Sequence, residues 1–140
     1  MEWTAAYVGL PYLRLGRDRS GVDCWGLARL PVVEIKGLPI PLWDTVGPED
    51  GAALGEVVET GRHDGSWLSI DPNAAREFDF VRMRAPVEIG GRTVWRPVHI
   101  GLVGPRRQVL HIQRNETSQL QPIEALRNRI TEFCRHRGLQ

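Results

Sequence analysis

The sequence predicts an α+β domain in which helices come first and an antiparallel sheet follows. Helical patterns occupy the first 61 residues, whereas strand patterns dominate from residue 78 onward. Prolines separate the short strand-like runs, and this order favours antiparallel neighbours over alternating β-α-β units. We expect the 140 residues to form a single domain over 1–140, with an excursion at 44–77.

The N-terminal part combines a short and a long helical segment. The partly apolar run Trp3 to Val8 predicts one or two helical turns, ended by a glycine and a proline. A charged, glycine-containing loop follows from Leu15 to Val22. Cys24 then begins a dense apolar run that ends at Gly37, and this density predicts a buried helix rather than an amphipathic surface helix.

Pro31 disturbs this second helix. A proline there removes the hydrogen bond to the carbonyl of Leu27 and crowds the preceding turn, which costs about 3 kcal/mol in a helix interior. We therefore expect a kink at Pro31, or a helix that stops and restarts.

The middle of the chain is expected to cover the core. Pro48 is followed by two acidic residues and predicts the start of a second helix, which Gly61 ends. The polar stretch from Arg62 to Glu77 predicts a surface excursion anchored by Trp67 and Ile70.

The second half of the chain is predicted to form the sheet. One or two helical turns are expected over Pro122 to Asn128. The strand-like runs are Phe78–Met83, Glu88–Trp95, Val98–Val103, Gln108–Gln113 and, last, Ile130–Cys134.

Composition excludes several classes of protein. The formal net charge of +1 gives no global field that would attract nucleic acid or an anionic membrane. The N-terminus lacks a secretory signal and no run is long enough to cross a bilayer, so we expect synthesis in the cytoplasm and no membrane insertion. The two cysteines, Cys24 and Cys134, do not form the pattern of a disulfide-stapled scaffold and are expected to be thiols.

Cys24 stands where a loop meets the start of the predicted buried helix. Unpaired backbone N–H groups and the helix dipole stabilise a thiolate at such a position, and a depressed cysteine pKa makes a nucleophile at neutral pH. The cysteine alone is equally compatible with a small core residue.

Two histidines occupy strand-like runs on either side of one short turn. His99 shares a strand face with Gly101 and Val103, and His111 shares one with Val109 and Gln113. Around a four-residue turn the two histidines would point to different faces. A three-residue turn at Gly104 to Arg106, or a five-residue turn at Val103 to Arg107, would place them directly opposite each other, so a catalytic interpretation requires an odd turn or a bulge.

Four short segments carry this chemistry in a fixed order: Pro11-Tyr12, Asp23-Cys24-Trp25-Gly26-Leu27, His99-Ile100-Gly101 and His111. The ordered set resembles the signature of the NlpC/P60 family, in the short form found among phage tail-associated peptidases. The resemblance spans most of the chain. It implies a papain-like core, in which the nucleophile begins a helix packed on an antiparallel sheet that carries the histidines.

The resemblance also implies roles for individual residues. Cys24 would be the nucleophile, His99 the general base, and His111 the acceptor that orients the base, as in a catalytic triad. Tyr12 matches a family tyrosine whose hydroxyl could help the oxyanion site; its other interpretation is a packed aromatic residue. Asp79 matches an acidic position for which we expect a structural role.

The implied substrate is the stem peptide of bacterial peptidoglycan, often cleaved after a D-isoglutamyl residue. The implied setting is a phage tail or tail-like particle acting at the cell wall, with other tail proteins as partners. No cofactor or metal is needed. Cys24, His99 and His111 could mimic a zinc site only if their geometry allowed tetrahedral coordination.

Departures from the family pattern leave two alternatives. Pro31 interrupts the helix, Trp25 stands where many members have serine, and 44–77 is longer than a minimal core needs. The chain could be a catalytically weak docking component of a tail tip. It could instead be a papain-like amidase or acyltransferase, including an injected antibacterial effector. His63, His136 and Cys134 lie outside the matched positions, and we expect structural or surface roles for them.

Overall fold

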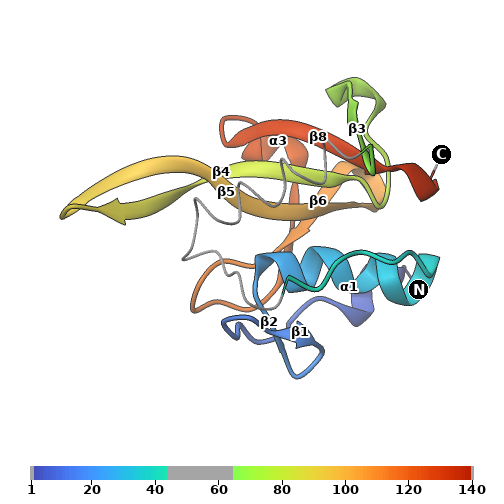
Figure 1. The fold of residues 1–140 in the computed structure, drawn as a ribbon, viewed down its shortest axis with the longest axis horizontal. Helices are drawn as coiled ribbons and strands as arrows, with labels where there is room; N and C mark the ends of the chain where they lie inside the picture. The colour runs from blue at the N-terminus through green and yellow to red at the C-terminus, as the bar shows by residue number, and fades with distance from the viewer. Residues whose placement is uncertain (1, 44–64, 140) are drawn as a thin grey trace.

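A computed structural model describes residues 2–43 and 65–139 of the chain. The long helix α1, Cys24–Lys36, lies along one face of a six-stranded sheet, so the predicted α+β class is confirmed (Figure 1). A short 3-10 helix, Trp3–Ala6, forms the predicted N-terminal turn. The predicted helix between Pro48 and Gly61 lies outside the described residues.

The sheet is antiparallel throughout, as the sequence predicts. Its strand order is β3-β8-β4-β5-β6-β7. The strands are β3 Trp67–Ile70, β4 Phe80–Ile89, β5 Arg92–Gly104, β6 Gln108–His111, β7 Gln119–Pro122 and β8 Ile130–His136. The four-residue helix α3, Ile123–Leu126, falls within the range predicted for one or two helical turns.

Smaller elements complete the described chain. The strands β1, Arg17–Asp18, and β2, Gly21–Val22, form a two-stranded sheet within the predicted loop. Three further 3-10 helices are Pro72–Ala74, Pro105–Arg107 and Arg137–Leu139. The loop before α1 is therefore more ordered than a charged, glycine-containing sequence suggests.

The strands β4 and β5 form one long hairpin that projects beyond the body of the sheet (Figure 1). The predicted separate strand Glu88–Trp95 is wrong, because this segment is the tip of the hairpin and turns at Gly90 and Gly91, both with positive φ. Pro97 was predicted to end a strand, yet β5 continues through it. The register shifts between Met83 and Ala85 on the facing strand, and a proline is tolerated at such a bulge.

Two other expectations need correction. Residues 67–70, predicted as part of a surface excursion, form the edge strand β3, although Trp67 and Ile70 do pack against the core as anchors. The helix α1 neither stops nor restarts at Pro31 but continues to its predicted end at Gly37. Pro31 and most of α1 are buried, and this packing offsets the lost hydrogen bond.

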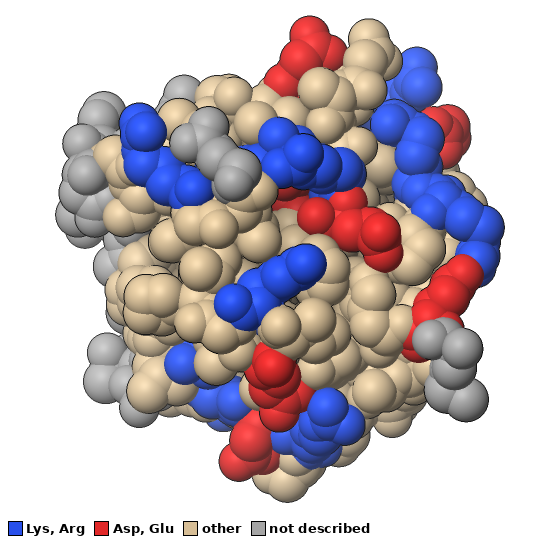
Figure 2. All heavy atoms as spheres, turned by 90° about the vertical axis from the view of Figure 1, so that its right-hand side faces the viewer, with Lys and Arg blue, Asp and Glu red and all other residues tan. Residues whose placement is uncertain are grey.

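The core lies on both faces of the sheet, because successive strand residues point to opposite sides. One cluster joins α1 to the sheet through residues such as Leu27, Leu102 and Leu110. The other lies on the opposite face, where Val103, Val109 and Phe133 pack under α3. On the face drawn in Figure 2, basic and acidic side chains are interspersed, in keeping with the small net charge.

Candidate active site

Asp23 fixes the start of α1, and with it the position of Cys24. Its carboxylate is fully buried and accepts a hydrogen bond from the backbone N–H of Gly26 at 2.8 Å, which caps the helix. The same carboxylate accepts from the backbone N–H of Leu15 and forms an ion pair of 2.6 Å with Arg17. Cys24 therefore lies on a helix end that is tied to the preceding loop.

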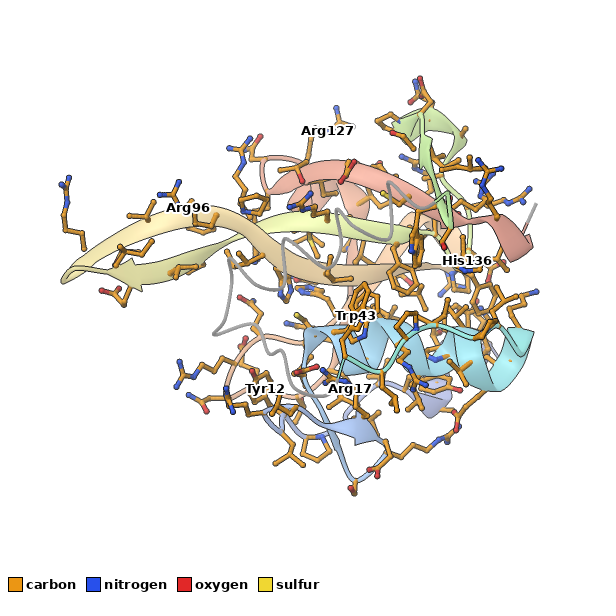
Figure 3. All side chains as sticks on the ribbon, viewed as in Figure 1. Tyr12, Arg17, Trp43, Arg96, Arg127 and His136 are labelled. Atoms are coloured by element: carbon orange, nitrogen blue, oxygen red, sulfur yellow. The ribbon has the colours of Figure 1, made fainter. Side chains whose placement is uncertain are left out.

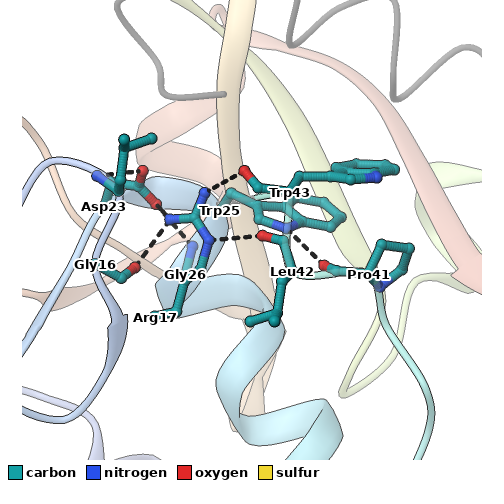
Figure 4. Close-up of polar contacts among 9 residues, drawn as sticks. Gly16, Arg17, Asp23, Trp25, Gly26, Pro41, Leu42 and Trp43 are labelled. Carbon is teal, nitrogen blue, oxygen red and sulfur yellow. Dashed lines mark hydrogen bonds and ion pairs between the residues drawn. The ribbon is translucent and has the colours of Figure 1, made fainter. Parts of the chain in front are cut away.

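Arg17 extends this attachment to the segment after α1 (Figure 4). Its guanidinium donates to the carbonyls of Leu42 and Trp43 at 2.7 and 2.8 Å. The indole N–H of Trp25 donates to the carbonyl of Pro41 at 3.0 Å. The loop before α1 and the segment after it are thus connected through one buried ion pair.

Close backbone contact explains the glycine two positions after Cys24. A Cβ atom added at Gly26 would lie 2.0 Å from the carbonyl oxygen of Gly16. The loop backbone therefore lies so close to α1 that only glycine, which has no Cβ atom, fits at position 26.

The two histidines meet on β5 and β6. His99 Nε2 lies 3.0 Å from His111 Nδ1, with both rings buried. The turn Pro105–Arg107 between the paired residues Gly104 and Gln108 has three residues, so the expectation of an odd turn is confirmed. The expectation of direct pairing is wrong, because the register offsets His111 from His99 by two residues and they meet as diagonal neighbours.

A third polar side chain extends the hydrogen-bonded pair of histidines. His111 Nε2 is hydrogen bonded to Oε1 of Gln121, which belongs to β7. Neither the strand β7 nor a role for Gln121 is among the predictions from the sequence. The alternating run Gln119-Leu120-Gln121 is the period-two signal that could have revealed them, although four residues make a weak pattern.

The hydrogen bonds determine where the protons lie. Because the amide oxygen of Gln121 only accepts, His111 Nε2 carries a proton and its Nδ1 is an acceptor. His99 Nε2 then donates to that Nδ1, which leaves His99 Nδ1 unprotonated. His99 is thereby held as a neutral base with one nitrogen available.

Cys24 and His99 line one cavity of about 490 Å³. It lies where the start of α1 passes under the base of the β4–β5 hairpin (Figure 1). Tyr12 also lines the cavity and lies beside this end of α1 (Figure 3). The lining is completed by Ala85, Pro86, Val87, Glu88, Val98, Ile112, Gln113, Arg114, Glu116 and Arg129. No hydrogen bond joins the described side chains of Cys24 and His99.

Burial determines the charge state of the pair. Cys24 is 1% exposed, and burial, followed by the neighbouring Asp23 carboxylate, raises the pKa of its thiol to about 12, against weaker backbone hydrogen bonds at Ile100 and Trp25. The expectation of a depressed cysteine pKa is therefore wrong. Burial likewise lowers the pKa of His99 to about 3, with smaller contributions from His111 and Arg129. Without substrate, both groups are neutral at pH 7.

The remaining candidate residues lie away from this cavity. Asp79 is fully buried and forms an ion pair with Arg135 at 2.7 Å, which fits the expected structural role. His136 packs edge-on against Trp67 at the sheet edge. Cys134 is a buried thiol on β8. His63 lies outside the described residues.

Among the described residues, no group of three or more histidine, cysteine or acidic side chains could hold a metal ion. Neither cysteine forms a disulfide. No helix in the described part of the chain is long and apolar enough to cross a membrane.

The helix packed on a six-stranded antiparallel sheet matches the papain-like fold of an NlpC/p60 domain. A search of solved structures finds the NlpC/p60 domain of the peptidoglycan hydrolase SagA with a TM-score of 0.60 and 20% sequence identity. The match covers 93% of this chain and 90% of that domain. No family model matches the sequence, and no curated protein matches it.

Proposed function

We propose that this protein is a cysteine peptidase that hydrolyses peptide bonds in peptidoglycan stem peptides, with Cys24 as nucleophile and His99 as general base. The observation that carries the proposal is the shared cavity of about 490 Å³, in which both residues take part, together with the 3.0 Å contact between His99 and His111. The fold of a peptidoglycan hydrolase domain supports the substrate class.

The neutral resting pair fits attack with simultaneous proton transfer. His99 Nδ1 takes the proton from the Cys24 thiol as the sulfur attacks the peptide carbonyl, so no isolated thiolate has to form in the buried site. The imidazolium that results is stabilised through its Nε2–H by His111, which Gln121 orients in turn. His111 and Gln121 are positioning residues in this scheme.

The negative oxygen of the tetrahedral intermediate needs hydrogen-bond donors. Backbone N–H groups at the start of α1 are proposed to supply them, and Tyr12, which lines the same cavity, is proposed to assist. The imidazolium of His99 then protonates the leaving amine as the C–N bond breaks, which leaves a thioester on Cys24. Water attacks this thioester and gives a proton to His99. His99 then returns this proton to the sulfur as the C–S bond breaks, which releases the free carboxylic acid and restores the thiol.

The experiment that tests this function is direct. The protein is incubated with purified stem peptides, and the products are identified by mass. The proposal expects two fragments whose masses sum to the substrate plus one water. A substrate that stays intact with wild-type protein at high enzyme concentration would contradict it.

A second candidate is favoured by one observation, the raised thiol pKa of a cysteine that is 1% exposed. This burial would suit a docking component of a tail tip in which hydrolysis is weak or lost. Turnover separates the two candidates, because the docking component would bind its assembly without cleaving peptide. The phage tail setting rests on the short form of the motif set, and finding the chain in purified particles would support it.

A further inference from the structure

Trp95 lies in different surroundings from the other tryptophans of the chain. Four of the five tryptophans are buried in, or packed against, the cluster that joins α1 to the sheet: Trp3, Trp25, Trp43 and Trp67. Trp95 belongs to neither of the two core clusters that the described residues form, and it is 53% exposed on the β4–β5 hairpin. Single exposed apolar side chains are common, so the neighbours of Trp95 decide whether it belongs to a site.

The hairpin places Trp95 beside the cavity that Cys24 and His99 line. Trp95 pairs with Pro86 on the facing strand, and Pro86 also lines this cavity. Residues that pair directly lie on the same face of a hairpin. Figure 3 shows Arg96 on the side of the hairpin away from α1, so Trp95, one position earlier, lies on the side toward α1.

One contact fixes the orientation of the indole ring. The guanidinium carbon of Arg129 lies 5.8 Å from the centre of the Trp95 ring, and Arg129 also contributes to the lining of the cavity. Nε of Arg129 donates to the carbonyl of Arg84 at 3.1 Å, which holds this side chain against β4. Because the ring is already oriented, a ligand that packs on it loses less free energy in ordering the side chain.

A polar pair lies beside the ring on the same face of the hairpin. Glu88 pairs with Thr93, two positions along each strand from Pro86 and Trp95, so the four side chains share one face. The hydroxyl of Thr93 donates to the carboxylate of Glu88; both residues are exposed, and Glu88 lines the cavity. A carboxylate can accept several hydrogen bonds. An aromatic ring beside such an acceptor fits a sugar, which has an apolar C–H side and a rim of polar groups.

The substrate class proposed above brings a sugar to this part of the molecule, because each stem peptide is attached to a sugar through a lactyl ether. For a bond that follows the second stem residue, the sugar is two residues and the ether away, on the order of 10 Å. Trp95 and His99 are four positions apart on β5, which is at most about 13 Å. A peptide whose scissile bond lies at His99 can therefore place its sugar near Trp95.

We propose that the indole ring of Trp95 stacks on the sugar that carries the stem peptide, with Glu88 as a hydrogen-bond acceptor for its polar groups. The inference rests on the proposed function and extends the recognised substrate from the peptide to the attached sugar. The enzyme should therefore prefer stem peptides that are still attached to sugar over free stem peptides.

The test compares one stem peptide with and without its N-acetylglucosaminyl-N-acetylmuramyl disaccharide. We expect the disaccharide to raise kcat/KM of the wild-type protein by about 5- to 20-fold, mainly through a lower KM, as for one aromatic stacking contact. In Trp95→Ala the ratio of the two kcat/KM values should fall to about one. Trp95→Phe should keep most of the preference because it keeps an aromatic face, and Glu88→Ala should lose part of it.

Ile89→Ala is the matched control. Ile89 is 49% exposed on the same hairpin, but it lies next to Glu88 in the strand and therefore on the opposite face. This variant should keep the wild-type ratio. A wild-type enzyme that cleaves both substrates equally well, or a Trp95→Ala variant that keeps the full preference, would overturn the role of Trp95 and leave the proposed function intact. If wild-type protein cleaves neither substrate, the proposed function itself fails.

A binding measurement tests the sugar contact without turnover. In ¹⁵N-labelled Cys24→Ala protein, the NMR signal of the Trp95 indole N–H is identified by its loss when Trp95→Phe is added. The disaccharide peptide should shift this signal, whereas the free peptide should shift it much less. Equal shifts with the two ligands, or no shift with saturating disaccharide peptide, would mean that Trp95 lies outside any sugar site and would overturn the proposal.

Discussion

The two cysteines of this chain are both buried thiols, yet they lie in very different surroundings. Cys24 lines a cavity of about 490 Å³ that is also lined by His99. Cys134 lines a cavity of about 30 Å³ whose walls include the aromatic rings of Trp25, Trp67 and Phe80. Exposure is 1% for Cys24 and 9% for Cys134, so the less exposed thiol is the candidate nucleophile.

If Cys24 is the nucleophile, as proposed, accessibility of the sulfur does not identify the reactive cysteine in this fold. What distinguishes Cys24 is a base in the same cavity, held in one tautomer by two further residues. Cys134 lines an apolar space large enough for about one water molecule, which leaves no room for a peptide substrate. The expected difference in reactivity between the two cysteines therefore depends on the side chains beside each sulfur and on the volume of the cavity.

The largest expected effect comes from replacing each of the two cysteines in turn. Cys24→Ala and Cys24→Ser should abolish peptide cleavage, because no other group in the cavity can form the thioester. Cys134→Ala should keep activity within a few fold. Both alanine variants remove a buried sulfur, so each should lose about 1 kcal/mol of stability. Turnover by mass and thermal unfolding measure the two properties, and a fully active Cys24→Ala protein would end the assignment.

The next effect concerns the unequal roles of the two histidines. His99→Ala should be as damaging as loss of Cys24, since His99 both takes and gives the proton. His111→Asn should keep measurable activity, because an amide oxygen can also accept the hydrogen bond from His99. His111→Ala should lose more, with a gap of roughly 1.5–3 kcal/mol in the barrier. Values of kcat/KM on one stem peptide decide the order, and an inactive His111→Asn variant would refute these roles.

Acid sensitivity of the fold provides a third effect. The pKa of His99 is lowered from 6.5 to about 3, so the folded protein binds its proton less readily than the unfolded chain. The contribution of His99 to the free energy of unfolding should be fully present above pH 6.5. It should be lost as the pH drops toward 3, by about 1.4 kcal/mol per pH unit from this residue alone. Denaturant unfolding between pH 7 and pH 4 measures the slope. His99→Gln should have a shallower slope, and an equal slope would contradict the buried neutral histidine.

The smallest effect should come from replacing Gln121, the last residue in the hydrogen-bonded series His99, His111 and Gln121. Gln121→Ala removes the acceptor for His111, which loosens the tautomer of His111 and hence the orientation of His99. A neutral hydrogen bond of this kind contributes about 0.5–1.5 kcal/mol, so kcat/KM should fall roughly 2- to 10-fold. The neighbouring Gln119→Ala serves as the control and should change activity less.

The sequence predicts much of this arrangement, and the limits have physical causes. The alternation of strand residues correctly places His99 with Gly101 and Val103 on one face, because side-chain direction is local. The three-residue turn at Pro105–Arg107 has positive φ at Arg106 and Arg107, which residue preferences do not predict, and it shifts His111 by two residues. The diagonal contact between the histidines therefore could not be read from their spacing.

The charge states of buried groups are harder to predict from the sequence than the face on which a strand residue lies. The position of Cys24 at a helix start suggests a depressed pKa, but the pKa rises because the thiol is desolvated and Asp23 lies beside it. Desolvation arises only when distant segments close over the site, and no local pattern records it. Gln121 was missed for a related reason, since it acts through pairing of β7 with β6.

The most direct measurement is the site of covalent capture by a substrate-like electrophile. An alanyl-isoglutamyl chloromethyl ketone carries the acyl side of the stem peptide and alkylates the nucleophile that attacks it. Peptide mapping by mass should find one adduct on Cys24 and none on Cys134, with capture greatly slowed in His99→Ala. Equal modification of both cysteines, or a rate that does not depend on His99, would contradict the central claim that Cys24 and His99 act as a pair.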